Sequence, residues 1–207
     1  MSMKLNDALI TNFSIADKEY DIDLSFNKVL DVFEILKEDE MTRLEQAQLI
    51  VHLLTGQELY DIKEVVDCWI YIKEHFLGIE KETVQYDLLG NPMPKAKGEE
   101  EQEKLIDFEQ DAEYIYASFL QAYGINLLKV QNELTWTEFK ALLNALPDNT
   151  IMQQIIEIRA WKPEYGGDKN KMRKLQAKYS LGKEGEDNGW MEKLPSLSMW
   201  MVIKSRF

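Results

Sequence analysis

The stretch DFEQDAEYIYASFLQAYGIN, residues 107–126, sets four carboxylates at alternate positions in front of an aromatic run. On a helical wheel at about 100° per residue, one set of side chains falls within roughly 60° of Phe108. These side chains are Ala112, Ile115, Phe119 and Tyr123. Because such a stripe is typical of an amphipathic helix packed against a core, the stretch predicts a mainly α-helical fold.

The four carboxylates divide between the two flanks of the same wheel. Asp107 and Asp111 lie on one flank, and Glu109 and Glu113 lie on the other. Because they do not converge on one point, we expect a solvated flank rather than a metal or acid–base site. A calcium-binding loop is excluded, since the glycine at its sixth position and the glutamate at its twelfth are missing.

Helix signals continue on the C-terminal side of this stretch. Thr135 and Glu138 form a capping-box pattern in TWTEFKALLNALP, and Pro147 stops that helix. Another helix follows and stops before Pro163, since proline cannot continue it. Its apolar positions are Ile151, Ile155 and Ile158.

On the N-terminal side, NFSIADKEYDIDLSF, residues 12–26, alternates around ADKE and indicates a small β-hairpin. Ser25 is the expected N-cap of a first helix. Thr42 and Glu45 form the capping box of a second helix, which ends at Gly56. A third helix is expected to carry the apolar residues Ile62, Val65, Val66, Trp69, Ile70, Phe76 and Leu77.

Prolines, glycines and glutamates interrupt this order in the middle of the chain. We therefore predict an acidic flexible linker at residues 89–103, between a hairpin-plus-helix region, residues 1–88, and a helical region, residues 104–163. Residues 164–207 are expected to form a segment that is first basic and then rich in Met and Trp, and the C-terminal tail is expected to be irregular. Its basic residues are Lys169, Lys171, Arg173, Lys174, Lys178 and Lys183. The predicted fold is mainly α and bundle-like, with a small N-terminal hairpin.

Composition limits the classes of function. The chain has 207 residues, 45% of them apolar, and a formal net charge of −13. This charge disfavours broad binding to nucleic acid or to anionic lipid. Cys68 is the only cysteine, so an intramolecular disulfide is impossible and a reducing cytosol fits best. We expect neither an export signal nor a membrane span, because no apolar run approaches about 18 residues.

The residues that usually carry chemistry do not form a catalytic motif. His52 and His75 lie far apart in sequence and outside any zinc-protease pattern, and Cys68 sits among apolar residues of a helix. No phosphate-binding loop or serine-nucleophile elbow is present. We therefore expect no enzyme activity, no cofactor and no metal. Arg159, between isoleucines and Trp161, is expected to form a structural ion pair or to stack on an aromatic ring.

Four sequence segments together resemble the bacteriophage "gene product fifteen" family, which is found among tail-morphogenesis genes of phages and prophages of Gram-positive bacteria. The resemblance covers roughly residues 12–162 and is most specific in the second half. Its segments are YDIDLSF (20–26), DFEQDAEYIYASFLQAYGINL (107–127), LTWTEFKALLNALPDNT (134–150) and IIEIRAWK (155–162).

This resemblance implies a helical, non-enzymatic tail assembly chaperone that binds the tape-measure protein in the cytoplasm of the bacterial host and can also form a homo-oligomer. A structural tail component retained in the virion is the nearest alternative. A nucleic-acid-binding regulator that uses the basic residues is a more distant one. The candidate partner-binding residues are Trp136, Phe139, Arg159, Trp190, Met199 and Trp200. For the last three, packing against the body of the protein is an equal alternative.

Overall fold

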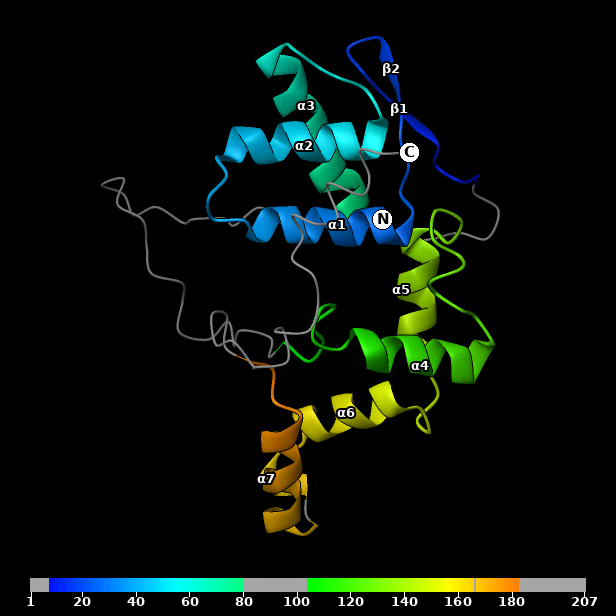
Figure 1. Cartoon of the computed structure of the whole chain (residues 1–207), viewed down its shortest axis with the longest axis vertical. Helices are drawn as coiled ribbons and strands as arrows, with labels where there is room; N and C mark the ends of the chain where they lie inside the picture. The colour runs from blue at the N-terminus through cyan, green and yellow to red at the C-terminus, as the bar shows by residue number, and fades with distance from the viewer. Residues whose placement is uncertain (1–7, 80–103, 166, 183–207) are drawn as a thin grey trace, which may run out of the picture.

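The structure, a computed structural model, describes residues 8–79, 104–165 and 167–182. Within them the mainly α-helical fold with an N-terminal hairpin is confirmed (Figure 1). The first region contains β1 (Asn12–Ile15), β2 (Lys18–Asp21), α1 (Phe26–Lys37), α2 (Arg43–Thr55), α3 (Ile62–Ile72) and a π-helical turn (Lys73–Leu77). The second contains α4 (Ala112–Tyr123), α5 (Trp136–Asn144), α6 (Ile151–Ala160), a 3₁₀ turn (Pro163–Tyr165) and α7 (Lys169–Lys178).

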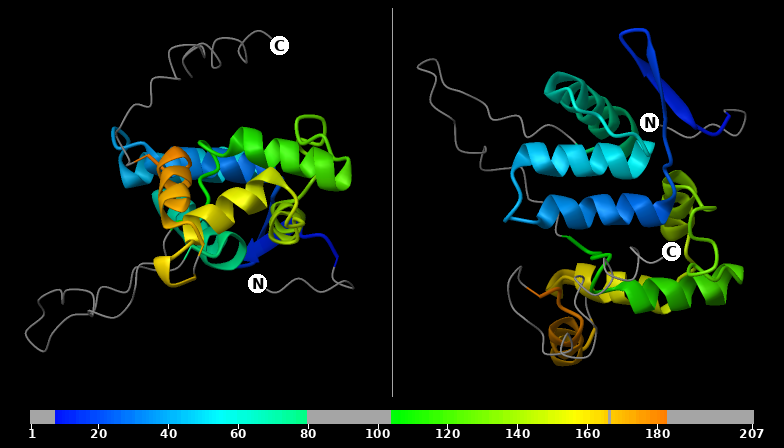
Figure 2. Two further views of the ribbon diagram at one scale, coloured as in Figure 1. Left: turned by 90° about the horizontal axis from the view of Figure 1, so that it is seen from below. Right: turned by 45° about the horizontal axis from the view of Figure 1, so that its top comes forward.

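The helices are arranged along the long axis of the molecule. Down that axis α2, α1, α4 and α6 follow one another, with α7 at the far end and α5 bridging from α1 to α4 (Figures 1 and 2). The predicted linker, residues 89–103, lies outside the described residues. Apolar residues on both sides of that break belong to one core, so the two regions pack as one structure.

The hairpin forms where the alternating pattern predicts it. Phe13 pairs with Tyr20 across the antiparallel strands, and both side chains are buried. The two turn residues, Ala16 and Asp17, have φ values of 46° and 67°, as a tight type I′ hairpin turn requires. Phe13 stacks on Tyr71 with ring centroids 5.1 Å apart, so the hairpin is held against the end of α3.

The predicted capping boxes of α2 and α5 are confirmed. Thr42 accepts the backbone N–H of Glu45, and Thr135 accepts that of Glu138. In each case the glutamate carboxylate also accepts the N–H of the threonine. These reciprocal bonds satisfy N–H groups that have no partner inside a helix.

Ser25 occupies the N-cap position of α1, but its side chain makes no capping hydrogen bond. Instead, the starts of α1 and α5 cap each other through the backbone. The Phe26 N–H donates to the Leu134 carbonyl over 2.9 Å, and the Trp136 N–H donates to the Leu24 carbonyl over 2.8 Å. This short antiparallel bridge joins two helix starts that lie more than a hundred residues apart in sequence.

The solvated-flank prediction is wrong for Asp107 and Asp111, which are only 6% and 1% exposed. Residues 108–111 form a turn and α4 begins only at Ala112, so a helical wheel started at Asp107 does not apply to these aspartates. Ala112, expected in the core stripe, is exposed in the first turn of α4. The prediction is confirmed for Glu109 and Glu113, which are exposed.

Candidate functional site

Two of the predicted partner-binding residues, Trp136 and Phe139, are buried in an aromatic cluster between α1, α4 and α5. Phe139 stacks on Phe26 and on Phe119, with centroid distances of 5.1 and 5.2 Å. The Trp136 and Phe33 rings pack in a T-shaped arrangement, with their centroids 5.5 Å apart. Since these rings fill the junction of the two regions, they support the fold.

Arg159, on α6, is confirmed as a structural ion pair. Its guanidinium binds the Asp111 carboxylate in bidentate fashion, with Nη1–Oδ2 and Nη2–Oδ1 distances of 2.6 and 2.8 Å. The same side chain donates to the carbonyl of Leu105 over 2.8 Å and to that of Tyr179 over 2.7 Å. Arg159 therefore ties together the approach to α4, the start of α4 and the end of α7.

Asp107 completes this charged network. Its carboxylate accepts the N–H groups of Glu109 and Gln110 and a hydrogen bond of 2.7 Å from Lys104 Nζ. Burial alone would raise the pKa of Asp107, but these donors outweigh burial and lower the pKa to about 2. The network is a set of paired charges that hold turns in place, and each carboxylate has a structural partner.

The described residues contain no group of three or more His, Cys, Asp or Glu side chains that is placed to hold a metal ion. Cys68 is buried, and burial raises the pKa of its thiol, which disfavours the reactive thiolate. Also within those residues, no helix is long and apolar enough to cross a membrane.

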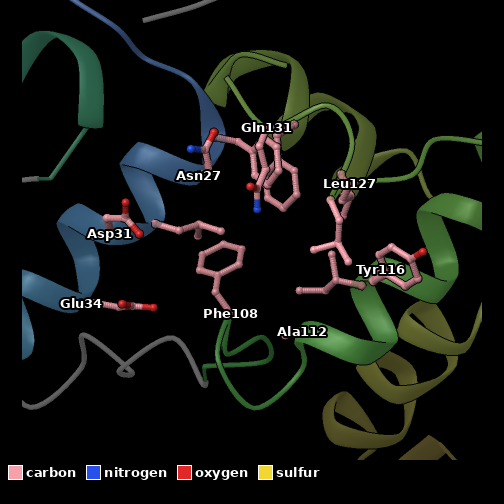
Figure 3. Close-up of a pocket in the computed structure, with 13 residues that line it drawn as sticks. Asn27, Asp31, Glu34, Phe108, Ala112, Tyr116, Leu127 and Gln131 are labelled. Carbon is pink, nitrogen blue, oxygen red and sulfur yellow. The ribbon is translucent and has the colours of Figure 1, made fainter. Parts of the chain in front are cut away.

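A groove of about 250 Å³ lies between α1 and α4 (Figure 3). Its floor is apolar, and Phe108 projects between the two sides. Asp31 and Glu34 line the α1 side, while Leu127 and Gln131, from the connection between α4 and α5, line the other. Burial, together with the charges of Asp31 and Glu109, raises the pKa of Glu34. The groove therefore combines an apolar floor with an acidic margin.

A second candidate surface is the outer face of α3. Ile62, Val66 and Ile70, four residues apart, are 57%, 37% and 44% exposed. The buried residues of α3 are Val65, Cys68 and Ile72. At about 100° per residue, the exposed row and the buried row are centred roughly 130° apart. One helix thus carries two apolar faces, of which only one meets the core of the described protein. We call the exposed row the α3 apolar face.

The α3 apolar face ends at a shallow depression beside the hairpin. Ile15, Ile70, Asp67, Glu74 and His75 line this depression together with Tyr71. The surroundings of the face therefore combine apolar and charged residues, with the carboxylates of Asp67 and Glu74 beside its C-terminal end. A helix with an apolar stripe and flanking basic residues would match both features.

The basic residues of α7 are exposed but do not form one face. Lys169 and Arg173 lie on one side of the helix, and Lys171, Lys174 and Lys178 lie on the other. Asp168 caps the helix N-terminus by accepting the N–H groups of Asn170 and Lys171. This spread of charge lacks the one-sided pattern that tracks a nucleic acid backbone.

Of the remaining predicted site residues, Trp190, Met199 and Trp200 lie outside the described residues, as does Lys183. Sequence reasoning missed both candidate surfaces. The α3 apolar face had a sequence signal, because the apolar residues of 62–77 cover too wide an arc for one contact. The groove had none, since its two sides come from segments about eighty positions apart.

The fold and surfaces define an acidic, mainly α-helical protein whose prominent features are an apolar groove and an exposed apolar helix face. A family model described as "Bacteriophage Gp15 protein" matches residues 5–181, so the chain belongs to this phage protein family. Searches among curated proteins and among solved structures found no match.

Proposed function

We propose that this protein is a non-enzymatic tail assembly chaperone, which binds the tape-measure protein in the host cytoplasm during tail morphogenesis. Membership of a bacteriophage family supports a phage role. The observation that carries the binding role is the α3 apolar face, because three large side chains at helical spacing are exposed on an otherwise acidic protein.

The α3 apolar face fits a helical partner better than a small molecule. Ile62, Val66 and Ile70 follow the i, i+4, i+8 spacing by which one amphipathic helix packs along another. Full burial of such a side chain contributes about 1.5–3 kcal/mol, so their remaining exposed area can support reversible binding. The net charge of −13 would keep a complex with an aggregation-prone helix soluble.

The test is co-expression of the full chain with a tagged tape-measure protein from the same genome, followed by pull-down and mass determination. We expect a soluble complex with several copies of this protein per tape measure. An insoluble tape measure, with this protein alone in the supernatant, would overturn the chaperone function.

A matched pair of variants tests the surface separately. The variant Ile62→Ser/Val66→Ser/Ile70→Ser should reduce the recovered tape measure about tenfold or more, since anchors of this kind dominate interface energy. Lys63→Ser alters an exposed polar position of the same helix and should leave recovery unchanged. Equal recovery with both variants would keep the chaperone function but reject the α3 apolar face as its surface.

The alternatives give different results. Stoichiometric presence of this protein in purified particles would favour a tail component that stays in the virion. Binding to duplex DNA or RNA that weakens steeply with salt would favour the regulatory alternative through α7.

A further inference from the structure

The described chain ends beside the groove between α1 and α4. The backbone N–H of Gly182 donates to the Gln110 side chain over 2.9 Å. Gln110 lies between Phe108 and Ala112, which both line the groove. Because Arg159 binds both the Tyr179 carbonyl and the Asp111 carboxylate, the end of α7 is fixed near the start of α4.

The residues that follow are long enough to cover the groove. Seven residues, 183–189, separate Gly182 from Trp190. Fully extended, seven residues span at most about 25 Å. The α1 side of the groove runs from Phe26 to Glu34, about 12 Å along the helix. The span of seven extended residues is therefore about twice the length of the α1 side of the groove.

The composition of residues 190–207 complements the groove. Ten of them are large and apolar: Trp190, Met191, Leu194, Leu197, Met199, Trp200, Met201, Val202, Ile203 and Phe207. Their charges are Lys193, Lys204 and Arg206 against Glu192, a net +2 in a chain of net −13. The groove offers the opposite charge, with Asp31 and Glu34 beside an apolar floor.

The size of the groove also favours side chains as its occupant. A volume of about 250 Å³ is below the roughly 300–1,000 Å³ that is typical of pockets for small-molecule ligands. Leu128, at one margin, is 69% exposed and adds an apolar edge outside the hollow itself. An occupant with several bulky apolar side chains along one chain segment can use both the hollow and this edge.

We propose that residues 190–207 dock in the α1–α4 groove of the same chain, with Trp and Met side chains on the apolar floor and basic side chains beside Asp31 and Glu34. The surface that this segment covers differs from the α3 apolar face. The inference therefore stands independently of the chaperone function, and it assigns Trp190, Met199 and Trp200 to packing within the chain.

Cysteine cross-linking in the full chain tests the docking. Cys68, the only native cysteine, is buried and should stay unreactive in the folded protein. Gln131→Cys on the groove margin, combined with Met199→Cys, should give an intramolecular disulfide that peptide mass mapping detects. Lys63→Cys on α3, combined with Met199→Cys, is the matched control and should give little. Equal cross-linking of the two pairs, or none from the groove pair, would overturn the docking.

The same experiment distinguishes the occupants. A disulfide between two chains, seen as a dimer under non-reducing conditions, would mean that a second copy supplies the segment and would overturn docking within one chain. A charge exchange gives a further check. Glu34→Lys should lower the cross-linking yield about two- to fivefold, Lys204→Glu in the same chain should restore it, and Glu40→Lys should not change it.

Discussion

The two regions of the molecule are held together by different forces. In residues 8–79 the hairpin and α3 meet through rings, with Phe13 stacked on Tyr20 and Tyr71. In residues 104–182 the corresponding role falls to Arg159, which binds three separate segments through charged and polar contacts. A shared aromatic cluster around Phe139 joins the two regions.

The two kinds of contact differ in how precisely they fix the distance and orientation of the groups that they join. Apolar packing has little directionality, so it tolerates small adjustments and loses stability in proportion to the surface removed. A bidentate guanidinium–carboxylate pair fixes both distance and orientation, which suits a region built from short helices and turns. Its weakness is that loss of one partner leaves the other charged and buried.

The largest loss of stability is expected in the aromatic cluster that joins the two regions. Phe139→Ala removes a buried ring that contacts α1 and α4, and should lower the free energy of unfolding by about 3–5 kcal/mol. Urea unfolding measures the loss. Because the cluster is shared, hydrogen exchange should accelerate in both α2 and α6. Acceleration in α6 alone would show that the two regions unfold separately.

The next largest loss of stability is expected when the Arg159–Asp111 ion pair is broken. Arg159→Met leaves the Asp111 carboxylate buried without its partner and should destabilise the protein by about 3 kcal/mol, the lower end for broken buried pairs. The double variant Arg159→Met/Asp111→Leu removes both charges, so it should be more stable than Arg159→Met alone. Urea unfolding of the wild type, both single variants and the double variant completes the cycle.

This pair also gives a contrast with the hairpin side. Lys18 and Glu64 form an ion pair on the N-terminal region in which Lys18 is half exposed. Lys18→Met should cost at most about 1 kcal/mol, as is usual for surface pairs. Similar losses for Lys18→Met and Arg159→Met would contradict the distinction between the two regions.

Local features of the fold were predictable from the sequence. The starts of α2 and α5 follow from Thr42–Glu45 and Thr135–Glu138, because a capping box is decided by residues three positions apart. The hairpin follows from alternation around two turn residues. The reciprocal bridge between the starts of α1 and α5 was not predictable, since Ser25 and Thr135 meet only in the folded chain.

The charged network shows where local reasoning fails. The expected helix at Asp107 gave the wrong environment for both aspartates, because α4 begins only at Ala112. Asp111 is buried against Arg159, which lies 48 residues further along the chain. One local signal was present: aspartate commonly accepts backbone N–H groups two or three residues later, as Asp107 does here. The groove gave no signal, because its sides come from distant segments.

Acid sensitivity should be concentrated in the charged region. The folded pKa of Asp107 is about 2, below its ordinary value of 3.8. Its stabilising effect is therefore fully present above pH 3.8 and is lost as the pH falls towards 2. At pH 7 Asp107→Asn should cost about 1–2 kcal/mol, a value reduced for solvent screening because Lys104 is half exposed.

The measurement is urea unfolding of both proteins between pH 7 and pH 2.5. The difference in free energy of unfolding between wild type and Asp107→Asn should shrink below pH 3.8. A difference that stays constant down to pH 2.5 would show that the Asp107 charge contributes nothing to the fold, and that the network depends on Arg159 alone.

The last comparison concerns two equivalent helix caps, one in each region. Thr42 and Thr135 make the same bonds to Glu45 and Glu138, but Thr135 also sits on the bridge to Ser25. Thr42→Ala should cost about 1 kcal/mol, and Thr135→Ala somewhat more, while serine at either position should retain most of the cap. The two caps are matched in their side-chain bonds. A larger loss of stability for Thr42→Ala than for Thr135→Ala would therefore mean that the bridge to Ser25 adds nothing to the stability of the α5 start.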